Sequence, residues 1–352
     1  MATMAQAIRM ALAYGEQNLG VTDIFGEDVG PPLGGVFTCT QGLRTAWNSP
    51  LDERGIIGAA IGLAVAGQKA VVEIQFSDYI FNTIDLLKLA GNSTWSSGGE
   101  FNFPMVVLTT VGSGVHGSIY HSHSFDAIMT HIPGWKLVYP SNSLDAYGLL
   151  IAALKDENPV MYFEPKSMLR NKGVERIPGE PEDEKTLRDM IDAPIGDRSA
   201  WKPRWPNLTD YTVPLGKAKL CLEGSDATVV SYGRTLPLCV EAAEKLRSEE
   251  GIRYDVLDLR TLAPYDWDAI SASIKKTGRV LFVNEDTEIT NFGEHLLRRA
   301  VDEFFYEIKV RPRLLAGKHV PGVGMAPTLE DASVPQQKDI YNAMREVAVE
   351  LA

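Results

Sequence analysis

Short apolar runs alternate with helical patterns along the first half of this 352-residue chain, and this alternation limits its possible folds most strongly. The apolar runs predict strands at 70–76, 105–111, 136–139 and 160–164. The helical patterns predict helices at 53–66, 80–89 and 144–154. Such alternation is typical of a mostly parallel α/β sheet covered by helices on both faces. Ligands of these sheets bind at loops that follow the carboxyl ends of strands.

The same alternation returns after residue 211 and predicts a second α/β domain. Its expected strands lie at 227–232, 254–259, 280–284 and 308–310, and its expected helices at 236–248, 267–275, 293–304 and from 339 onward. We therefore expect two three-layer, parallel-sheet domains, formed by residues 1–170 and 212–352.

The stretch between these domains, residues 171–211, is rich in proline, glycine and charge and shows no sustained hydrophobic period. It is longer than a plain loop usually is, so we interpret it as a linker or an insertion. Trp201 and Trp205 are unusual in a free linker, because aromatic side chains favour interfaces. We expect both tryptophans to dock on a surface, and our hypothesis is that a neighbouring subunit provides it.

Composition excludes several classes of function. The net charge of −12 argues against partners such as nucleic acid or anionic membranes. The three cysteines lack metal-like spacing, so we expect neither a disulfide framework nor a zinc site, and a reducing compartment is favoured. The apolar run 56–66 spans only eleven residues, and a helical pattern begins at the N-terminus, so we expect neither a membrane span nor a leader peptide. These features favour the cytoplasm, or the mitochondrial matrix for a processed organellar form.

Glu53 is a carboxylate at the start of a predicted helix that is otherwise almost entirely apolar. The fourteen residues after it contain no acid and, apart from Arg54, no charge. Residues 49–52 (Ser-Pro-Leu-Asp) predict a capping box with proline at the first helical position. A carboxylate at the edge of a dry interior gains affinity for protons, which is typical of functional groups. The alternative interpretation is a salt-bridged glutamate in a buried structural helix.

The same helix has one smooth face. Small residues recur three and four positions apart along it, at Gly55, Ala59, Gly62 and Ala66. Each glycine inside a helix costs about 1 kcal/mol relative to alanine. The arrangement therefore predicts that this face packs closely against another helix.

Four of the six histidines fall within sixteen residues, at His116, His121, His123 and His131. They follow the predicted strand 105–111 and a glycine-rich turn. A metal site is a weak interpretation, because cysteine is absent nearby and Asp126 is the close carboxylate. The turn lacks the Gly-Lys-Ser/Thr end of a phosphate-binding loop. A proton-transfer or oxyanion-binding site ranks first, and a structural role is the alternative for any single histidine, His131 above all.

Several sequence blocks now indicate a family. They are GEDV (26–29), GGVF (34–37), SPLDE (49–53), EIQFSDY (73–79), YHS (120–122), FEPK (163–166), VPLGKA (213–218) and DLRT (258–261). In these blocks the chain resembles the beta subunit of thiamine-diphosphate-dependent 2-oxo acid dehydrogenases, over nearly its whole length apart from residues 171–211. The blocks around 75–79 and 120–121 are more similar to the branched-chain type than to the pyruvate type.

The resemblance implies a thiamine pyrimidine-binding domain, a transketolase C-terminal-like domain and a role for Glu53. Glu53 would hydrogen-bond the aminopyrimidine ring of the cofactor, whose amino group then removes the thiazolium proton. The resulting carbanion would attack the keto carbon of a 2-oxo acid. Carbon dioxide leaves, and the acyl unit passes to the lipoamide of a dihydrolipoyl acyltransferase. Further residues that match family positions are Leu51, Gln75 and Tyr79 in the pyrimidine pocket, Glu27 near the cofactor and the subunit interface, His121 in acyl transfer, and Met105, Ala153, Leu154, Asp156 and Asn158 at a potassium site.

One family motif is missing from the chain. The family binds diphosphate and Mg²⁺ through a Gly-Asp-Gly…Asn motif, which this sequence does not contain. The resemblance therefore implies that a separate alpha subunit binds both groups, in an α2β2 heterotetramer that is active only when both subunits are present. The smooth helix face suits such an interface.

Other departures leave the substrate open. The family usually has two cations where this chain has Thr94 and Ser96, and glutamine where it has His123. Residues 321–325 replace an aromatic, proline-containing stretch of the family. An acetoin dehydrogenase beta subunit is the nearest alternative function, and a noncatalytic scaffold subunit is an alternative from another class. A scaffold has no need of a proton-binding carboxylate, which favours the enzyme.

Overall fold

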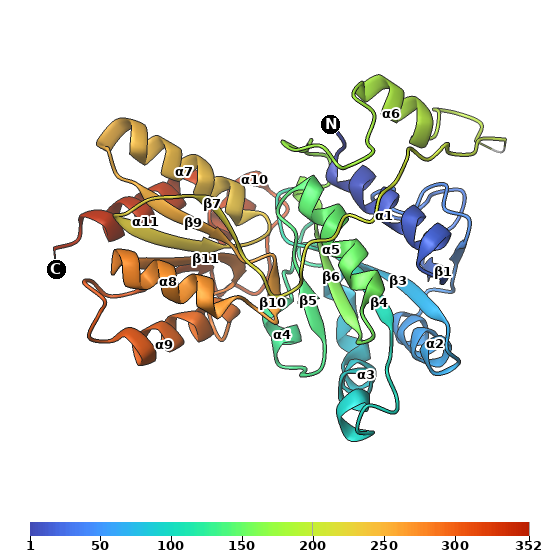
Figure 1. The fold of residues 1–352 in the computed structure, drawn as a ribbon, viewed down its shortest axis with the longest axis horizontal. Helices are drawn as coiled ribbons and strands as arrows, with labels where there is room; N and C mark the ends of the chain where they lie inside the picture. The colour runs from blue at the N-terminus through green and yellow to red at the C-terminus, as the bar shows by residue number, and fades with distance from the viewer. Residues whose placement is uncertain (199, 352) are drawn as a thin grey trace. The chain divides into compact units, whose positions relative to one another are not determined.

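The computed structural model describes residues 1–198 and 200–351 and divides into two compact units (Figure 1). The first unit contains Met1–Val111 and Ile132–Leu215, and the second contains Gly112–His131 and Gly216–Ala352. The segment with the clustered histidines thus groups with the second unit. The domain boundaries predicted above remain a proposal. No helix within the described ranges is long and apolar enough to cross a membrane.

A parallel sheet forms the centre of the first unit. Its strands are β1 (Val21–Gly26), β2 (Ala46–Asn48), β3 (Lys69–Phe76), β4 (Met105–Val111), β5 (Lys136–Val138) and β6 (Val160–Pro165), in the order β5-β6-β4-β3-β1-β2. Its α-helices are α1 (Met4–Asn18), α2 (Glu53–Val65), α3 (Ile84–Ser96), α5 (Ser143–Lys155) and α6 (Glu184–Ile191). The 3₁₀ helices are η1 (Ser77–Thr83) and η2 (Lys166–Met168). The predicted fold class, with its mostly parallel sheet, is confirmed.

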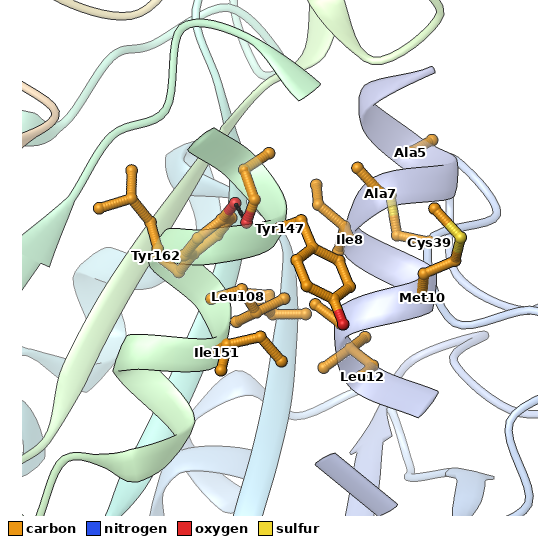
Figure 2. Packing of buried hydrophobic residues seen from close by; sticks show 14 of the residues in the cluster. Ala5, Ala7, Ile8, Met10, Leu12, Cys39, Leu108, Tyr147, Ile151 and Tyr162 are labelled. Carbon is orange, nitrogen blue, oxygen red and sulfur yellow. Dashed lines mark hydrogen bonds between the residues drawn. The ribbon is translucent and has the colours of Figure 1, made fainter. Parts of the chain in front are cut away.

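Helices α1 and α5 pack against each other over one face of this sheet (Figure 2). Ile8 of α1 and Ile151 of α5 are fully buried, as is Leu108 of β4. Each fully buried side chain of this size contributes roughly 1.5–3 kcal/mol. The Tyr162 hydroxyl donates to the Ala146 carbonyl at 2.8 Å, so this buried polar group has a partner. The apolar core therefore holds α1 firmly on the sheet.

Two local expectations in this unit are wrong. The helix predicted at 80–89 is two elements, because η1 covers Ser77–Thr83 and α3 begins only at Ile84. Helix α2 begins at Glu53 as predicted, but the capping box is absent: Asp52 is the N-cap, and its side chain makes no capping hydrogen bond to any described residue. Pro50 consequently precedes the helix instead of opening it.

The segment 171–211 packs on the first unit. Helix α6 lies within it, and Leu187 and Ile191 are fully buried in the unit's core. Trp205 packs partly buried against the same core, and the Trp201 ring lies directly over Gly42, where an added Cβ would come within 2.9 Å. The chain itself thus provides a docking surface for both tryptophans.

The second unit has its own mixed sheet. Its strands are β7 (Lys219–Leu222), β8 (Ala227–Ser231), β9 (Tyr254–Asp258), β11 (Val280–Thr287) and β12 (Arg313–Gly317), in the order β12-β11-β8-β9-β7. The pairing of β7 with β9 is antiparallel and the other described pairings are parallel. The remaining elements are β10 (Thr261–Ala263), α4 (Asp126–Thr130), α7 (Thr235–Glu250), α8 (Trp267–Thr277), α9 (Phe292–Phe304), α10 (Pro327–Ser333) and α11 (Gln337–Val349).

Helices α7 and α11 cover one face of this sheet, and α8 and α9 lie on the other (Figure 1). The strand expected at 308–310 is absent from the described chain, and β12 forms at Arg313–Gly317 instead. Pro312 has no backbone N–H to donate to a sheet, so the strand begins after it. The predicted second α/β layer structure is otherwise confirmed.

Candidate active site

Two parallel strands bring acidic and amide side chains to one edge of the first sheet. Strand β1 ends at Gly26, directly before Glu27 and Asp28, and its neighbour β3 carries Gln75 near its own carboxyl end. The Gln75 amide nitrogen lies 3.3 Å from Asp28 Oδ2 and 3.5 Å from the Glu27 carbonyl oxygen. The loop after β1 is therefore bound to the end of β3, where a ligand site is expected.

Glu53 lies in the same electrostatic neighbourhood. Burial raises the pKa of Glu27, and the charges of Glu53 and Asp28 raise it further. Burial also raises the pKa of Tyr79, with smaller contributions from Asp78, Glu27 and Glu53. The charges of Glu27 and Glu53 thus act on each other and on Tyr79. Gln75 contacts the loop that carries Glu27.

Glu53 and its neighbours are more exposed to solvent than the sequence predicted. Glu53 is half-buried in the isolated chain, and the Asn82 amide lies 3.5 Å from its Oε2. Leu51 is 79% exposed. The smooth face of α2 is exposed as well, and no described atom would lie within 4 Å of a Cβ added at Gly62. The dry mouth expected around Glu53 is therefore wrong for this chain by itself, because the described residues leave Glu53 only half-buried.

These groups fit the pyrimidine part of thiamine diphosphate. A carboxylate that can share a proton with a ring nitrogen is present in Glu53. Leu51 offers an exposed apolar surface, and Tyr79 packs edge-to-face with Phe76 at 5.7 Å between ring centroids. Apolar walls with a few placed polar groups are the usual lining of a cofactor pocket.

Carboxylates of the second unit hold the histidine segment. The backbone N–H of Ser113 donates to Glu285, and that of Gly114 donates to Glu330 Oε1 at 2.6 Å. His116 Nδ1 lies 2.5 Å from Glu330 Oε2. The consecutive acids Glu285 and Asp286 inside an apolar strand are the sequence signal of this anchoring, which was not predicted.

The ring of His121 contacts a backbone carbonyl of its own segment. Its Nδ1 lies 3.0 Å from the Gly117 carbonyl oxygen, which can only accept a hydrogen bond. Nδ1 therefore carries the hydrogen, and in the neutral ring Nε2 is the basic nitrogen. His131 makes a comparable contact to the Ala127 carbonyl at 2.7 Å, at the end of α4.

A second anchor of this segment is a pair of buried aspartates. Asp126 is fully buried, and the Tyr232 hydroxyl donates to its Oδ2 at 2.6 Å. Burial raises the pKa of Asp126 strongly, and the charge of Asp286 and a hydrogen bond to it act in the same direction. Within the described ranges, no cluster of three or more His, Cys, Asp or Glu residues could hold a metal ion.

The residues aligned with a potassium site lie around the end of α5 and the start of β4: Met105, Ala153, Leu154, Asp156 and Asn158. Two of their oxygens already have cationic partners. The Lys69 ammonium group donates to the Leu154 carbonyl at 2.7 Å, and Lys136 pairs with Asp156. Potassium binding remains a prediction, and it would require the ion to compete with both lysines.

Comparisons with known proteins agree with the fold. The profile described as "Transketolase, pyrimidine binding domain" matches residues 1–172, and "Transketolase, C-terminal domain" matches residues 216–340. A solved chain described as "Split gene transketolase, inactive beta4 tetramer" aligns over 100% of both chains with a TM-score of 0.73. Its sequence identity is 18%, so this likeness concerns the fold alone. The protein class is thus transketolase-like.

Curated relatives narrow the class. The 2-oxoisovalerate dehydrogenase subunit beta of Bacillus subtilis is 35% identical over 350 residues, with 97% of each chain covered. A mitochondrial 2-oxoisovalerate dehydrogenase subunit beta of Dictyostelium discoideum is 33% identical over 90% of this chain and 79% of its own length. The pyruvate dehydrogenase E1 component subunit beta of Acholeplasma laidlawii is 33% identical, with 90% and 89% covered. This chain belongs to the beta subunits of the thiamine-diphosphate-dependent 2-oxo acid dehydrogenases.

Proposed function

We propose that this beta subunit takes part in the oxidative decarboxylation of a branched-chain 2-oxo acid, together with an alpha subunit in an α2β2 heterotetramer. The observation that carries the proposal is a pair of contacts near the carboxyl edge of the first sheet. Gln75 contacts the loop that carries Glu27, and Glu53 contacts Asn82 of η1, the element that contains Tyr79. The names of similar curated proteins favour a branched-chain substrate over pyruvate, since most of these names contain 2-oxoisovalerate dehydrogenase.

Each residue has a defined task in this proposal. Thiamine diphosphate, when bound, supplies a carbon nucleophile that attacks the keto group of the substrate. Glu53 holds a proton at the aminopyrimidine ring, and Tyr79 and Leu51 line that ring. Gln75 is held by its contact with Asp28 and forms the neighbouring part of the pocket wall. Because the sequence has no Gly-Asp-Gly…Asn motif, the diphosphate and Mg²⁺ are assigned to the alpha subunit.

His121 is the proposed proton carrier in acyl transfer to lipoamide. The Gly117 carbonyl fixes its Nδ1–H, which makes Nε2 the nitrogen that accepts or gives a proton. The backbone bonds from Ser113 and Gly114 to buried carboxylates keep the segment in place. The lipoyl group belongs to a dihydrolipoyl acyltransferase, which is the further partner of the proposal.

The exposed stripe of α2 supports the alpha-subunit interface. The small residues Gly55, Ala59, Gly62 and Ala66 all face solvent in the isolated chain. Val65 beside them is 61% exposed. An exposed apolar face next to a functional carboxylate is typical of an interaction surface. A partner helix on this stripe would also remove water from Glu53.

Replacing Glu53 by glutamine tests the proposal. We expect 2-oxo-acid-dependent reduction of an artificial electron acceptor, with thiamine diphosphate and Mg²⁺, only when the chain is co-expressed with its alpha subunit. Glu53→Gln should lower kcat by about 100-fold or more, as loss of a proton-transfer group does. The matched control is Asp52→Asn, at the preceding exposed carboxylate, which should keep full activity.

Other results would redirect the proposal. Full activity of the Glu53→Gln complex would show that the chemistry lies elsewhere. An assembled complex that acts on acetoin but on no 2-oxo acid would favour acetoin cleavage. An assembled complex without either activity would favour a scaffold.

A further inference from the structure

Arg9 of α1 is a buried cation at the point where three parts of the first unit meet. Its side chain is 2% exposed. Its guanidinium donates to Asp192 Oδ1 at 2.6 Å, to the Ile191 carbonyl at 2.9 Å and to Gln41 Oε1 at 3.2 Å. Ile191 and Asp192 belong to the insertion, whereas Gln41 belongs to the loop between β1 and β2. One buried guanidinium thus joins helix, insertion and loop.

Two more hydrogen bonds complete this arrangement, which we name the Arg9 hub (Arg9, Gln41, Asp192). The backbone N–H of Ala193 donates to Gln41 Oε1 at 3.2 Å, and the Gln6 amide donates to Asp192 Oδ2 at 2.9 Å. Gln41 is itself buried, with 8% of its surface exposed. Buried charge-assisted bonds of this kind are strong and directional. The hub therefore fixes Gln41 relative to the insertion.

The loop between β1 and β2 connects the restrained Gln41 to the turn formed by Glu27 and Asp28. Thr40, next to Gln41, donates its hydroxyl hydrogen to the Val29 carbonyl at 2.8 Å, in a buried bond. The Gly35 N–H donates to the Asp28 carbonyl at 2.7 Å. The end of the loop that enters the hub is thus bound directly to residues that follow Glu27. A displacement of Gln41 would be passed on through these short contacts.

Backbone strain in this loop requires such support. Asp28 and Thr38 both have left-handed backbone conformations, with φ of 56° and 63°. A residue other than glycine held there costs of order 1–3 kcal/mol and persists only where the surroundings enforce it. Arg170 donates to the Thr38 hydroxyl at 3.2 Å, which is one such contact. The hub holds Gln41, whose backbone N–H donates to the Thr38 carbonyl at 3.5 Å.

We propose that the insertion acts through the Arg9 hub as a brace that positions the Glu27–Asp28 turn for binding of thiamine diphosphate. Gln41 is then a positioning residue, since it acts on the cofactor site only through Thr40 and the turn. This inference rests on the proposed function of Glu27 and Gln75. The sequence blocks that carry the family resemblance lie outside residues 171–211, so they do not include the insertion side of the brace.

The test compares Gln41→Leu with Gln41→Glu in the complex with the alpha subunit. Leucine has a side-chain volume similar to that of glutamine but cannot accept the hydrogen bonds from Arg9 and Ala193. Glutamate keeps an acceptor oxygen. We expect Gln41→Leu to weaken thiamine diphosphate binding about tenfold, measured by calorimetry on the cofactor-free complex, which corresponds to about 1.4 kcal/mol. Hydrogen exchange at residues 27–43 should accelerate in the same variant. Gln41→Glu should restore both values.

Controls separate a brace from general damage. Lys172→Met removes an exposed ion pair of the insertion with Glu184, at 2.8 Å, and should change neither readout. If Gln41→Leu does not assemble, Asp192→Asn breaks the hub from the insertion side and is measured in the same way. Unchanged cofactor affinity in the assembled variant overturns the proposal, whatever the exchange rates show. Retained activity of Glu53→Gln would instead overturn the proposed function, so the two failures are distinguishable.

Discussion

Replacing Glu73 by glutamine is expected to stabilise the first unit at alkaline pH and to have little effect at acid pH. Glu73 lies on β3 and is 3% exposed. Burial raises its pKa from 4.5 to about 7, and the charge of Asp28 adds to the rise, while a hydrogen bond from the Val36 backbone opposes it. Glu164, which is also fully buried, is electrostatically linked to it, and its own pKa is raised by burial and by Glu73.

The direction follows from the two pKa values. A carboxyl whose pKa is higher in the folded than in the unfolded chain stabilises the fold fully only below the unfolded value. That contribution is lost as the pH rises through the folded value, here from 4.5 to about 7. Each pKa unit corresponds to about 1.4 kcal/mol, so ionised Glu73 costs roughly 3 kcal/mol. Glutamine has the same shape, stays neutral and still accepts the Val36 bond.

The assay is urea unfolding of both proteins across the pH range, followed by tryptophan fluorescence. Above about pH 8 the variant should be more stable by roughly 3 kcal/mol, and near pH 4.5 the two should agree. Asp28→Asn is the companion variant, and it should reduce the pH dependence of the wild-type chain because it removes a charge that acts on Glu73. A difference between variant and wild type that is the same at all pH values would refute the reasoning.

Three further substitutions address buried charged groups and their hydrogen-bond partners. Asp192→Ala should destabilise the first unit by about 3–5 kcal/mol, since it leaves the buried Arg9 charge unpaired. Arg9→Met should cost less, because the Asp192 side chain is 35% exposed and can be hydrated. Denaturation midpoints in the opposite order would contradict this account. In the second unit, Tyr232→Phe removes a 2.6 Å hydrogen bond to buried Asp126 and should cost about 1–3 kcal/mol in calorimetry, whereas no change would show that the bond is dispensable.

Elements with strong local patterns were predictable from the sequence. Strand β4 occupies 105–111 as expected, because a run of apolar and β-branched residues between loops leaves few alternatives. Helix α2 begins at Glu53 as expected. The pocket residues Glu27 and Gln75 were predicted only through the family resemblance. In the structure, the Gln75 amide contacts the backbone carbonyl of Glu27. Their specific roles remain predictions.

Features that depend on distant partners were not predictable. Helix α6 is short and lies in a polar stretch, and it is stable because Leu187 and Ile191 enter a core built by other elements. In the sequence, Arg9 looks like an ordinary charged residue of an apolar helix. Its partners Gln41 and Asp192 cannot be recognised there, because they are 32 and 183 positions away. A single sequence carries no periodic signal for pairs at such separations.

That long separation also affects how the chain can be made. Arg9 is added to the nascent chain 183 residues before Asp192. At roughly 5–20 residues per second, the delay is about 10–40 s. During this time Arg9 has no carboxylate partner, and burying its charge is costly. The first helix of the nascent protein should therefore be among the last elements to reach its final place, only after the inserted segment has been synthesised.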